Sequence, residues 1–128
     1  MNPDTRILLI DGDAFFARIY EKRMKESGFC VDIASNGDAG IKKACSDTPA
    51  CIVLDLLLPG KDGFQVLDEL KNEAGTKGIP VFILTDLCEP EDIDRCMKAG
   101  ACGFATKTHT TPEDVISQLI KVVGGGVE

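Results

Sequence analysis

The stretch IVLDLLLPGKDGFQVLDELK, residues 52–71, contains the signals that decide the fold. The apolar run at 50–56 is short and rich in Ile, Val and Leu, which is typical of a strand buried on both faces of a sheet. A Pro-Gly turn follows, and Asp62 then occupies the position of a helix cap ahead of apolar residues with helical spacing. The stretch therefore predicts a buried strand, a turn and an amphipathic helix in succession.

The same alternation of strand and helix extends along the rest of the chain. Further strand-like apolar runs lie at 6–10, 29–34, 79–85 and 102–106. Segments with helical spacing separate and follow them. This alternation predicts an α/β fold, a doubly wound parallel sheet of about five strands with helices on both faces.

Caps and stops delimit the remaining helices. Asn36 is expected to cap the second helix, Pro90 to lie in the first turn of the fourth, and Thr111 to cap the fifth. Gly28 and Gly100 are expected to end the first and fourth helices. The expected apolar stripes contain Phe16, Ile19, Arg23, Met24, Ile41, Ala44, Cys45, Phe64, Leu67, Leu70, Ile93, Cys96, Met97, Val115, Ile116, Leu119, Ile120 and Val123.

Length and composition favour one soluble domain. The chain has 128 residues, 44% of them hydrophobic and 27% charged, which predicts a single domain over 1–128 with its core at about 5–123 and a flexible tail at 124–128. A net charge of −7 disfavours non-specific binding to nucleic acid or anionic membranes. No apolar stretch approaches the roughly 20 residues of a membrane span, and the N-terminus lacks signal-peptide features, so we expect a cytoplasmic protein.

The six cysteines form no CxxC pair, and His109 is the only histidine. A zinc site therefore has no local support. Each cysteine lies among apolar or small residues, so we expect reduced thiols buried in the core.

Polar residues gather where the predicted strands end. In a doubly wound sheet, ligands bind at the carboxyl ends of the strands. Clustered carboxylates repel one another unless a cation or a shared proton relieves them, and paired aspartates are typical of a magnesium site. The residues at these ends are Asp11, Asp13, Asp55, Thr85, Asp86 and Lys107.

This set favours phosphoryl chemistry. Asp55 is the expected nucleophile, forming an acyl phosphate. A metal ion and Lys107 are expected to neutralise charge on the transferred group. The Thr85 hydroxyl is expected to donate a hydrogen bond to a phosphoryl oxygen.

With these residues in view, the chain resembles the response-regulator receiver domains of two-component signalling. The resemblance covers residues 5–123 and rests on the stretch at 52–71 together with ILLIDGD, PVFILTD and AGACGFATK in the expected order. It implies a flavodoxin-like fold with strand order 2-1-3-4-5, and a stand-alone receiver of the chemotaxis type. It also implies partners: a sensor histidine kinase or phosphotransfer protein that donates the phosphoryl group, and an unknown downstream protein.

The resemblance assigns roles by position. Asp55 resembles the phosphoacceptor, and Asp11 the first member of an acidic pair that binds Mg²⁺. Leu57 would offer its backbone carbonyl to the metal. Thr85 resembles the switch hydroxyl and Lys107 the phosphate-sensing lysine.

The resemblance also implies how the signal leaves the domain. Phe104 resembles the aromatic residue that reorients with Thr85 on activation. The altered face would be built from the fourth helix, the fifth strand and the fifth helix. Such a protein is no enzyme beyond assisting its own phosphorylation and dephosphorylation.

One departure from the family concerns the metal. Gly12 stands where the family usually has a second acid that binds the metal directly. Asp13 is either a displaced ligand or a helix cap. We therefore predict weaker Mg²⁺ binding than in a receiver with both acids.

Other departures flank the acceptor. Asp86 follows Thr85 where the family prefers a small residue; it is a solvent-exposed carboxylate, a source of repulsion, or part of the metal shell. Leu57 and Leu87 are expected to exclude water and slow loss of the phosphoryl group. Thr108 replaces the usual cis proline after the lysine, and we expect a trans bond there because a cis bond without proline costs about 2.5–4 kcal/mol.

Two other function classes stay open at this point. A degenerate receiver would bind a partner constitutively without phosphorylation, and Gly12 favours it. A haloacid-dehalogenase-type phosphatase would use DGD at 11–13 as its opening motif, but the chain is short for that family and leaves Asp55 unexplained. A dinucleotide-binding domain is weaker, because no GxGxxG follows the first strand.

Overall fold

The computed structural model describes residues 5–124 and forms five strands and five helices in strict alternation. The strands are β1 (Arg6–Ile10), β2 (Cys30–Ala34), β3 (Cys51–Leu54), β4 (Val81–Thr85) and β5 (Gly103–Thr106). The helices are α1 (Ala14–Glu26), α2 (Gly37–Asp47), α3 (Gly63–Asn72), α4 (Pro90–Lys98) and α5 (Pro112–Gly124). The predicted tail, apart from Gly124, lies outside the described residues.

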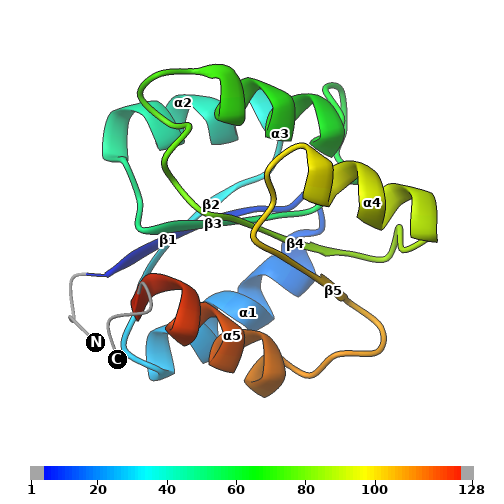
Figure 1. The fold of residues 1–128 in the computed structure, drawn as a ribbon. Helices are drawn as coiled ribbons and strands as arrows, with labels where there is room; N and C mark the ends of the chain where they lie inside the picture. The colour runs from blue at the N-terminus through cyan, green and yellow to red at the C-terminus, as the bar shows by residue number, and fades with distance from the viewer. Residues whose placement is uncertain (1–4, 125–128) are drawn as a thin grey trace.

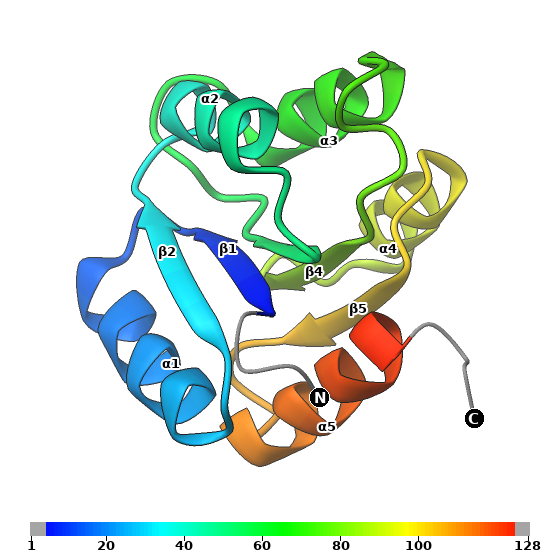
Figure 2. The ribbon, with the colours of Figure 1, turned by 90° about the vertical axis from the view of Figure 1, so that its left-hand side faces the viewer.

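The strands form one parallel sheet in the order β2-β1-β3-β4-β5. Figures 1 and 2 show α1 and α5 on one face of this sheet and α2, α3 and α4 on the other. The predicted doubly wound five-stranded sheet and its strand order are confirmed. Within residues 5–124, no helix is long and apolar enough to cross a membrane.

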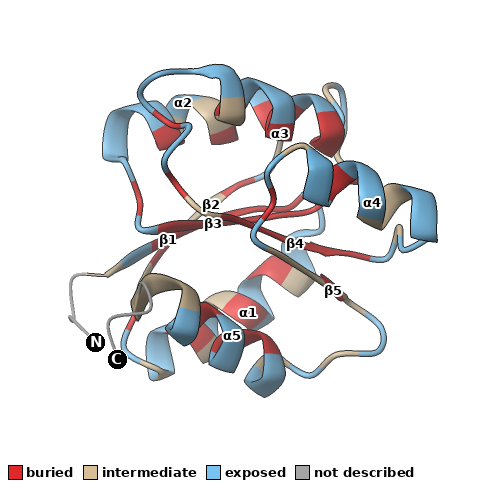
Figure 3. Ribbon diagram, in the orientation of Figure 1, coloured by how far each residue is buried: buried red, intermediate tan, exposed pale blue. Residues whose placement is uncertain are grey.

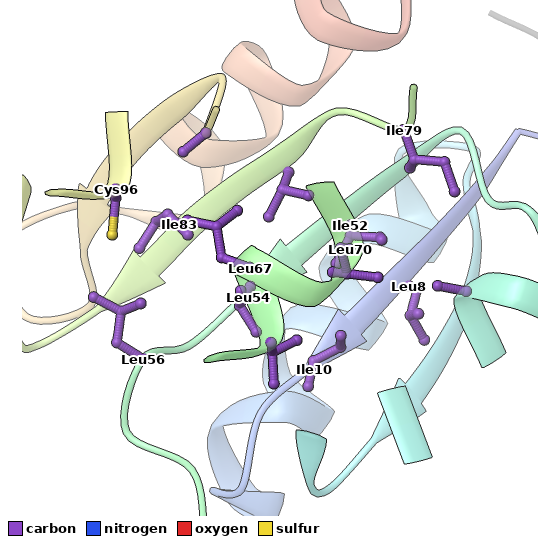
Figure 4. Packing of buried hydrophobic residues seen from close by; sticks show 14 of the residues in the cluster. Leu8, Ile10, Ile52, Leu54, Leu56, Leu67, Leu70, Ile79, Ile83 and Cys96 are labelled. Atoms are coloured by element: carbon purple, nitrogen blue, oxygen red, sulfur yellow. The ribbon is translucent and has the colours of Figure 1, made fainter. Parts of the chain in front are cut away.

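Two hydrophobic cores lie on the two faces of the sheet, as the buried positions in Figure 3 indicate. Side chains alternate along β3, so Ile52 and Leu54 pack under α3 whereas Cys51 and Val53 pack toward α1 and α5. Figure 4 shows Leu67 and Leu70 of α3 in the first of these cores. All four residues of β3 are buried, which explains its uninterrupted apolar sequence.

The helix ends follow the predicted chemistry. Asn36 Oδ1 accepts a hydrogen bond from the Ala39 amide at 2.9 Å, and Thr111 Oγ1 accepts one from the Asp114 amide at 3.1 Å. Asp62 caps α3 in a capping box, in which its own amide donates to the Gln65 side chain. These caps fix where each connection between strand and helix enters its helix.

The predicted helix faces are wrong at several positions. Ile19, Met97 and Ile120 are 40%, 44% and 42% exposed, whereas they were expected to face the core. The buried face of α1 consists of Ala17, Tyr20 and Met24, of which only Met24 belongs to the predicted stripe. Because consecutive helical residues point about 100° apart, an apolar residue beside the stripe lies at its solvent-exposed edge.

The expectation for the cysteines is also partly wrong. Cys51 and Cys96 are buried free thiols, but Cys45, Cys88 and Cys102 are exposed. Cys88 and Cys102 lie in connections flanking α4, and Cys45 faces away from the core contacted by Ala44. Small residues adjoining a cysteine in the sequence do not determine the direction of its side chain.

Candidate functional site

The site begins at two adjacent central strands. Asp11 directly follows β1 and Asp55 directly follows β3, and both carboxylates are buried. The Asp11 amide donates to the carbonyl of Ala34 at 2.9 Å, and the Asp55 amide donates to the carbonyl of Ile10 at 3.0 Å. Pairing with the neighbouring strand thus continues to the acidic residues and holds their backbone in place. The two carboxylates lie at the edge of the sheet where the sequence predicts a ligand.

Lys107 joins the two carboxylates from the end of β5. Its Nζ lies 2.8 Å from Asp11 Oδ2 and 2.8 Å from Asp55 Oδ2. The side chain is only 9% exposed, and its Nζ lies 4.3 Å above the ring of Phe16, a cation–π contact. The structure therefore brings together Asp11, Asp55 and Lys107, as the sequence predicts.

Thr85 contacts Asp55 from the end of β4. Its hydroxyl donates to Asp55 Oδ1 at 2.5 Å, and the Leu57 amide donates to the same oxygen at 3.1 Å. The Leu87 amide in turn donates to Thr85 Oγ1 at 3.3 Å. Asp55 is thus held by a hydroxyl, an amide and an ammonium group, each from a different connection of the sheet edge.

The buried charges shift one another's ionisation. Burial raises the pKa of Asp11, although the hydrogen bonds from Lys107 and the Asp13 amide oppose this change. Burial lowers the pKa of Lys107, but its contacts with Asp11 and Asp55 outweigh that cost and leave the pKa above its ordinary value. One ammonium group between two carboxylates is therefore the dominant charge arrangement.

Asp13 acts as a helix cap. Its Oδ1 accepts a hydrogen bond from the Phe16 amide at 3.1 Å, and the residue is exposed. Its own amide donates to Asp11 Oδ1 at 2.8 Å. Asp13 thus begins α1 with its side chain and orients Asp11 with its backbone.

Gly12 lies beneath the loop that follows β3. A Cβ built on Gly12 would lie 2.9 Å from Cδ of Pro59, closer than side chains normally approach. The loop carrying Pro59 therefore fills part of the space that a second acidic side chain would need. The contact with Pro59 is thus a steric reason for a glycine at position 12.

The donor set fits magnesium, but with few ligands. Among residues 5–124, no group of three or more His, Cys, Asp or Glu side chains is arranged around a common metal position. The carboxylates available at the sheet edge are those of Asp11 and Asp55. Mg²⁺ commonly keeps several waters and binds through one or two carboxylates together with phosphate oxygens, so the two carboxylates fit this mode of coordination.

Sequence reasoning missed two contacts around this set. Phe16 stacks on Tyr20 with ring centroids 4.6 Å apart and covers the Lys107 ammonium. Asp86 Oδ1 accepts hydrogen bonds from the amide of Thr108 at 3.1 Å and from its hydroxyl at 2.5 Å. In the sequence, Phe16 is marked only by helical spacing and Asp86 only by its residue type. Neither signal predicts these contacts, because both depend on how separate connections meet in space.

Two further expectations concern the edge strand β5. No peptide bond among residues 5–124 is cis, so the predicted trans bond between Lys107 and Thr108 is confirmed. Phe104 is half-buried, pairs with Ile83 of β4, and packs on the core beneath α2, α3 and α4.

Comparison with known proteins identifies relatives of most of the chain. Residues 7–120 match the family model for the response regulator receiver domain. The chain is 34% identical over 102 residues to the response regulator PleD of Caulobacter vibrioides, covering 80% of this chain and 22% of PleD. It is 30% identical over 118 residues to the phosphate regulon transcriptional regulatory protein PhoB of Escherichia coli, covering 92% of this chain and 51% of PhoB.

Solved structures of receiver domains have the same fold as this chain. A CheY-like receiver domain protein from Methanospirillum hungatei superposes with a TM-score of 0.88 at 20% identity, covering 95% of both chains. This likeness shows the fold alone. The chain spans about a fifth to a half of the length of the curated relatives named above.

Proposed function

The chain belongs to the response-regulator receiver family, and from that premise we propose that Asp55 accepts a phosphoryl group from a phosphohistidine donor. The observation that carries the proposal is the set of contacts on its carboxylate. Thr85, Lys107 and the Leu57 amide all contact Asp55, and Asp11 lies on the far side of the same ammonium group. Receiver domains are phosphoacceptors, and their partners are histidine kinases or phosphotransfer proteins.

The chemical step is a displacement at phosphorus. A lone pair of the Asp55 carboxylate forms the new O–P bond while the P–N bond of the donor breaks, and that bond's electrons remain on the imidazole. Lys107 pairs with the charge on the phosphoryl oxygens, since its Nζ already lies 2.8 Å from Asp55 Oδ2. The Thr85 hydroxyl gives up its hydrogen bond to Asp55 Oδ1 and donates to a phosphoryl oxygen instead.

We assign Mg²⁺ binding to Asp11, Asp55 and the backbone carbonyl of Leu57. When bound, Mg²⁺ would offset negative charge between the acceptor and the incoming group. Weak binding is expected, because position 12 supplies no carboxylate and Asp13 is used as a helix cap. Lys107 supplies part of the positive charge that a weakly bound metal would provide, since its ammonium group already lies between Asp11 and Asp55.

Output is proposed to proceed through the face formed by α4, β5 and α5, with Thr85 and Phe104 as the moving parts. Thr85 begins the connection to α4, and Phe104 is half-buried against the adjacent core. Movement of the Thr85 side chain toward a phosphoryl group therefore alters the packing around both the connection to α4 and Phe104. We propose a single receiver over residues 1–128 that binds a protein target, not nucleic acid, in the cytoplasm.

The test is phosphorylation by acetyl phosphate with Mg²⁺, followed by intact-protein mass spectrometry. Wild type is expected to gain one phosphoryl group and Asp55→Ala none. Asp94→Ala is the matched control, because Asp94 is an exposed aspartate that pairs with Lys98 on α4. A gain that persists in Asp55→Ala would refute the assignment of the acceptor.

The alternative is a degenerate receiver that binds its partner without phosphorylation. Gly12 beneath Pro59 favours it, as does the neutralisation of both acids by Lys107. Absence of a mass gain in wild type, with no spectral response to beryllofluoride and Mg²⁺, would support this alternative. The phosphatase interpretation loses its basis, because the DGD sequence is the turn after β1 of a receiver.

A further inference from the structure

A hydrogen-bonded clasp joins the two connections that carry Thr85 and Lys107. Asp86 directly follows Thr85 and Thr108 directly follows Lys107. Asp86 Oδ1 accepts hydrogen bonds from both the amide and the hydroxyl of Thr108, at 3.1 and 2.5 Å. The Lys107 amide also donates to the carbonyl of Thr85 at 3.1 Å. The clasp therefore extends the pairing of β4 with β5 by one residue beyond the strands.

Together with the acceptor, the clasp closes a ring of contacts. The Thr85 hydroxyl donates to Asp55, and Lys107 Nζ donates to the other oxygen of the same carboxylate. On the outer side, Asp86 and Thr108 join the residues that follow the threonine and the lysine. Both groups that contact Asp55 are thus connected twice, once through Asp55 and once through the clasp.

Such a ring matters most for the lysine. A lysine side chain has many rotamers, and holding its ammonium group at one place costs conformational entropy. The backbone at 107–109 leads from an edge strand into a solvent-exposed connection, since Thr108 and His109 are exposed. Fixing the residue next to Lys107 therefore reduces the positions that its backbone, and hence its ammonium group, can reach.

We propose that Asp86 is a positioning residue for Lys107, acting through Thr108. It contacts neither the acceptor nor the expected phosphoryl group in the described contacts; its carboxylate holds the backbone from which Lys107 reaches Asp11 and Asp55. The inference rests on the proposed function, because Lys107 belongs to the same phosphoacceptor site.

Chemical labelling of lysines tests the proposal without any phosphodonor. Wild-type Lys107 is expected to react slowly with an acylating reagent, because it is buried and paired with two carboxylates. Asp86→Ala is expected to raise its labelling rate about fivefold, as loss of a hydrogen-bonded charged acceptor allows. Lys61, which pairs with Asp38 and Glu69 elsewhere, is the internal reference and is expected to keep its rate.

Further variants separate positioning from general destabilisation. Asp86→Asn keeps an oxygen that accepts from Thr108, so it is expected to restore slow labelling of Lys107. Thr108→Val loses the hydroxyl but keeps the amide, so an intermediate rate is expected, and this variant decides the question if Asp86→Ala fails to fold. Asp94→Ala is the control for loss of an exposed carboxylate.

An unchanged Lys107 rate in folded Asp86→Ala or Thr108→Val would overturn the proposal. So would a rise in which Lys61 accelerates equally, since that pattern reports loss of the whole fold. Phosphorylation by acetyl phosphate is measured in parallel. If wild type gains no phosphoryl group but Asp86→Ala raises the Lys107 labelling rate, the proposed function fails and the clasp stands. If wild type is phosphorylated but the Lys107 labelling rate does not change in Asp86→Ala, only the clasp is refuted.

Discussion

Gly12 lies beneath Pro59, so a Cβ at position 12 would meet the proline ring at 2.9 Å. The sequence alone indicates that a carboxylate is missing here, but not that a neighbouring loop fills the space. The contact joins two turns that are far apart in the chain, and residue types do not report how closely such turns approach. A side chain at position 12 therefore requires Pro59 or its loop to shift.

We predict that Gly12→Asp alone changes Mg²⁺ affinity little, because Pro59 prevents its carboxylate from reaching a ligand position. Gly12→Asp with Pro59→Ala is expected to raise the affinity on the order of tenfold, since a third carboxylate then becomes available. Isothermal titration calorimetry with Mg²⁺ measures both, with Pro59→Ala as the control. If the double variant binds no more tightly than Pro59→Ala, the explanation of weak binding by position 12 is wrong.

At the residue scale, the convergence of the site's side chains was predictable from the sequence, whereas several of their individual contacts were not. The convergence of Asp11, Asp55, Thr85 and Lys107 follows from their places after parallel strands, because the carboxyl ends of such strands share one edge. The attachment of Asp86 to another connection does not follow from any periodicity.

At the scale of elements, the strands were predictable because a buried parallel strand requires a continuous apolar run. The predicted run at 79–85 contains β4, and the run at 29–34 contains β2. Helix faces were harder, since Ile19 and Tyr20 are both apolar neighbours but only Tyr20 is buried. Which neighbour faces the core depends on the rotation of the helix against the sheet, and that rotation is decided by packing.

The junction between β3 and α3 leaves no space for a side chain at Gly63. A Cβ there would lie 2.4 Å from Cα of Leu56 and 2.5 Å from the carbonyl oxygen of Asp55. Because both neighbours are backbone atoms, the helix or the end of the strand has to move. The first turn of α3 thus lies directly against the backbone of Leu56 and of Asp55, the proposed phosphoacceptor.

We predict that Gly63→Ala lowers the free energy of unfolding by about 1–3 kcal/mol, the usual cost of overpacking. It is also expected to slow phosphorylation of Asp55 by acetyl phosphate, because the acceptor backbone shifts. Gly75→Ala is the matched control, since no atom lies within 4 Å of a Cβ built there. Urea unfolding and the phosphorylation rate are measured on both variants; equal behaviour would show that the junction tolerates a side chain.

For the whole molecule, the arrangement of helices divides the interior into two cores on one sheet. Tyr20 belongs to the core beneath α1 and α5 and is 2% exposed. Its burial raises the pKa of the phenol to about 12. Folding stability at alkaline pH therefore depends on keeping this hydroxyl protonated.

The sign of this dependence follows from the two states. In the unfolded chain the phenol loses its proton near pH 10, whereas the folded protein keeps it to about pH 12. We predict that the contribution of Tyr20 to stability is complete below about pH 10 and falls as the pH rises from there toward 12. Tyr20→Phe is expected to flatten the fall in overall stability in part, because burial also raises the pKa of Cys51 to about 12 and that of Cys96 to about 11.

Absorbance measures the titration directly, since the chain has one tyrosine and no tryptophan. Urea unfolding at several pH values measures the stability of wild type and Tyr20→Phe. An absorbance transition near pH 10 in the folded protein, or identical pH profiles for the two proteins, would contradict the prediction.

The three exposed cysteines give the native chain its own attachment points for spectroscopic probes. Cys88 lies in the connection that follows Asp86 and Leu87, and Cys102 directly precedes β5. Cys45 lies on α2, which packs against β1 and β2 at the other end of the sheet. A dye on Cys88 would report rearrangement near Thr85, the proposed switch residue, and one on Cys45 would serve as a distant reference. Cys51 and Cys96, enclosed in the two cores, would remain unlabelled while the protein stays folded.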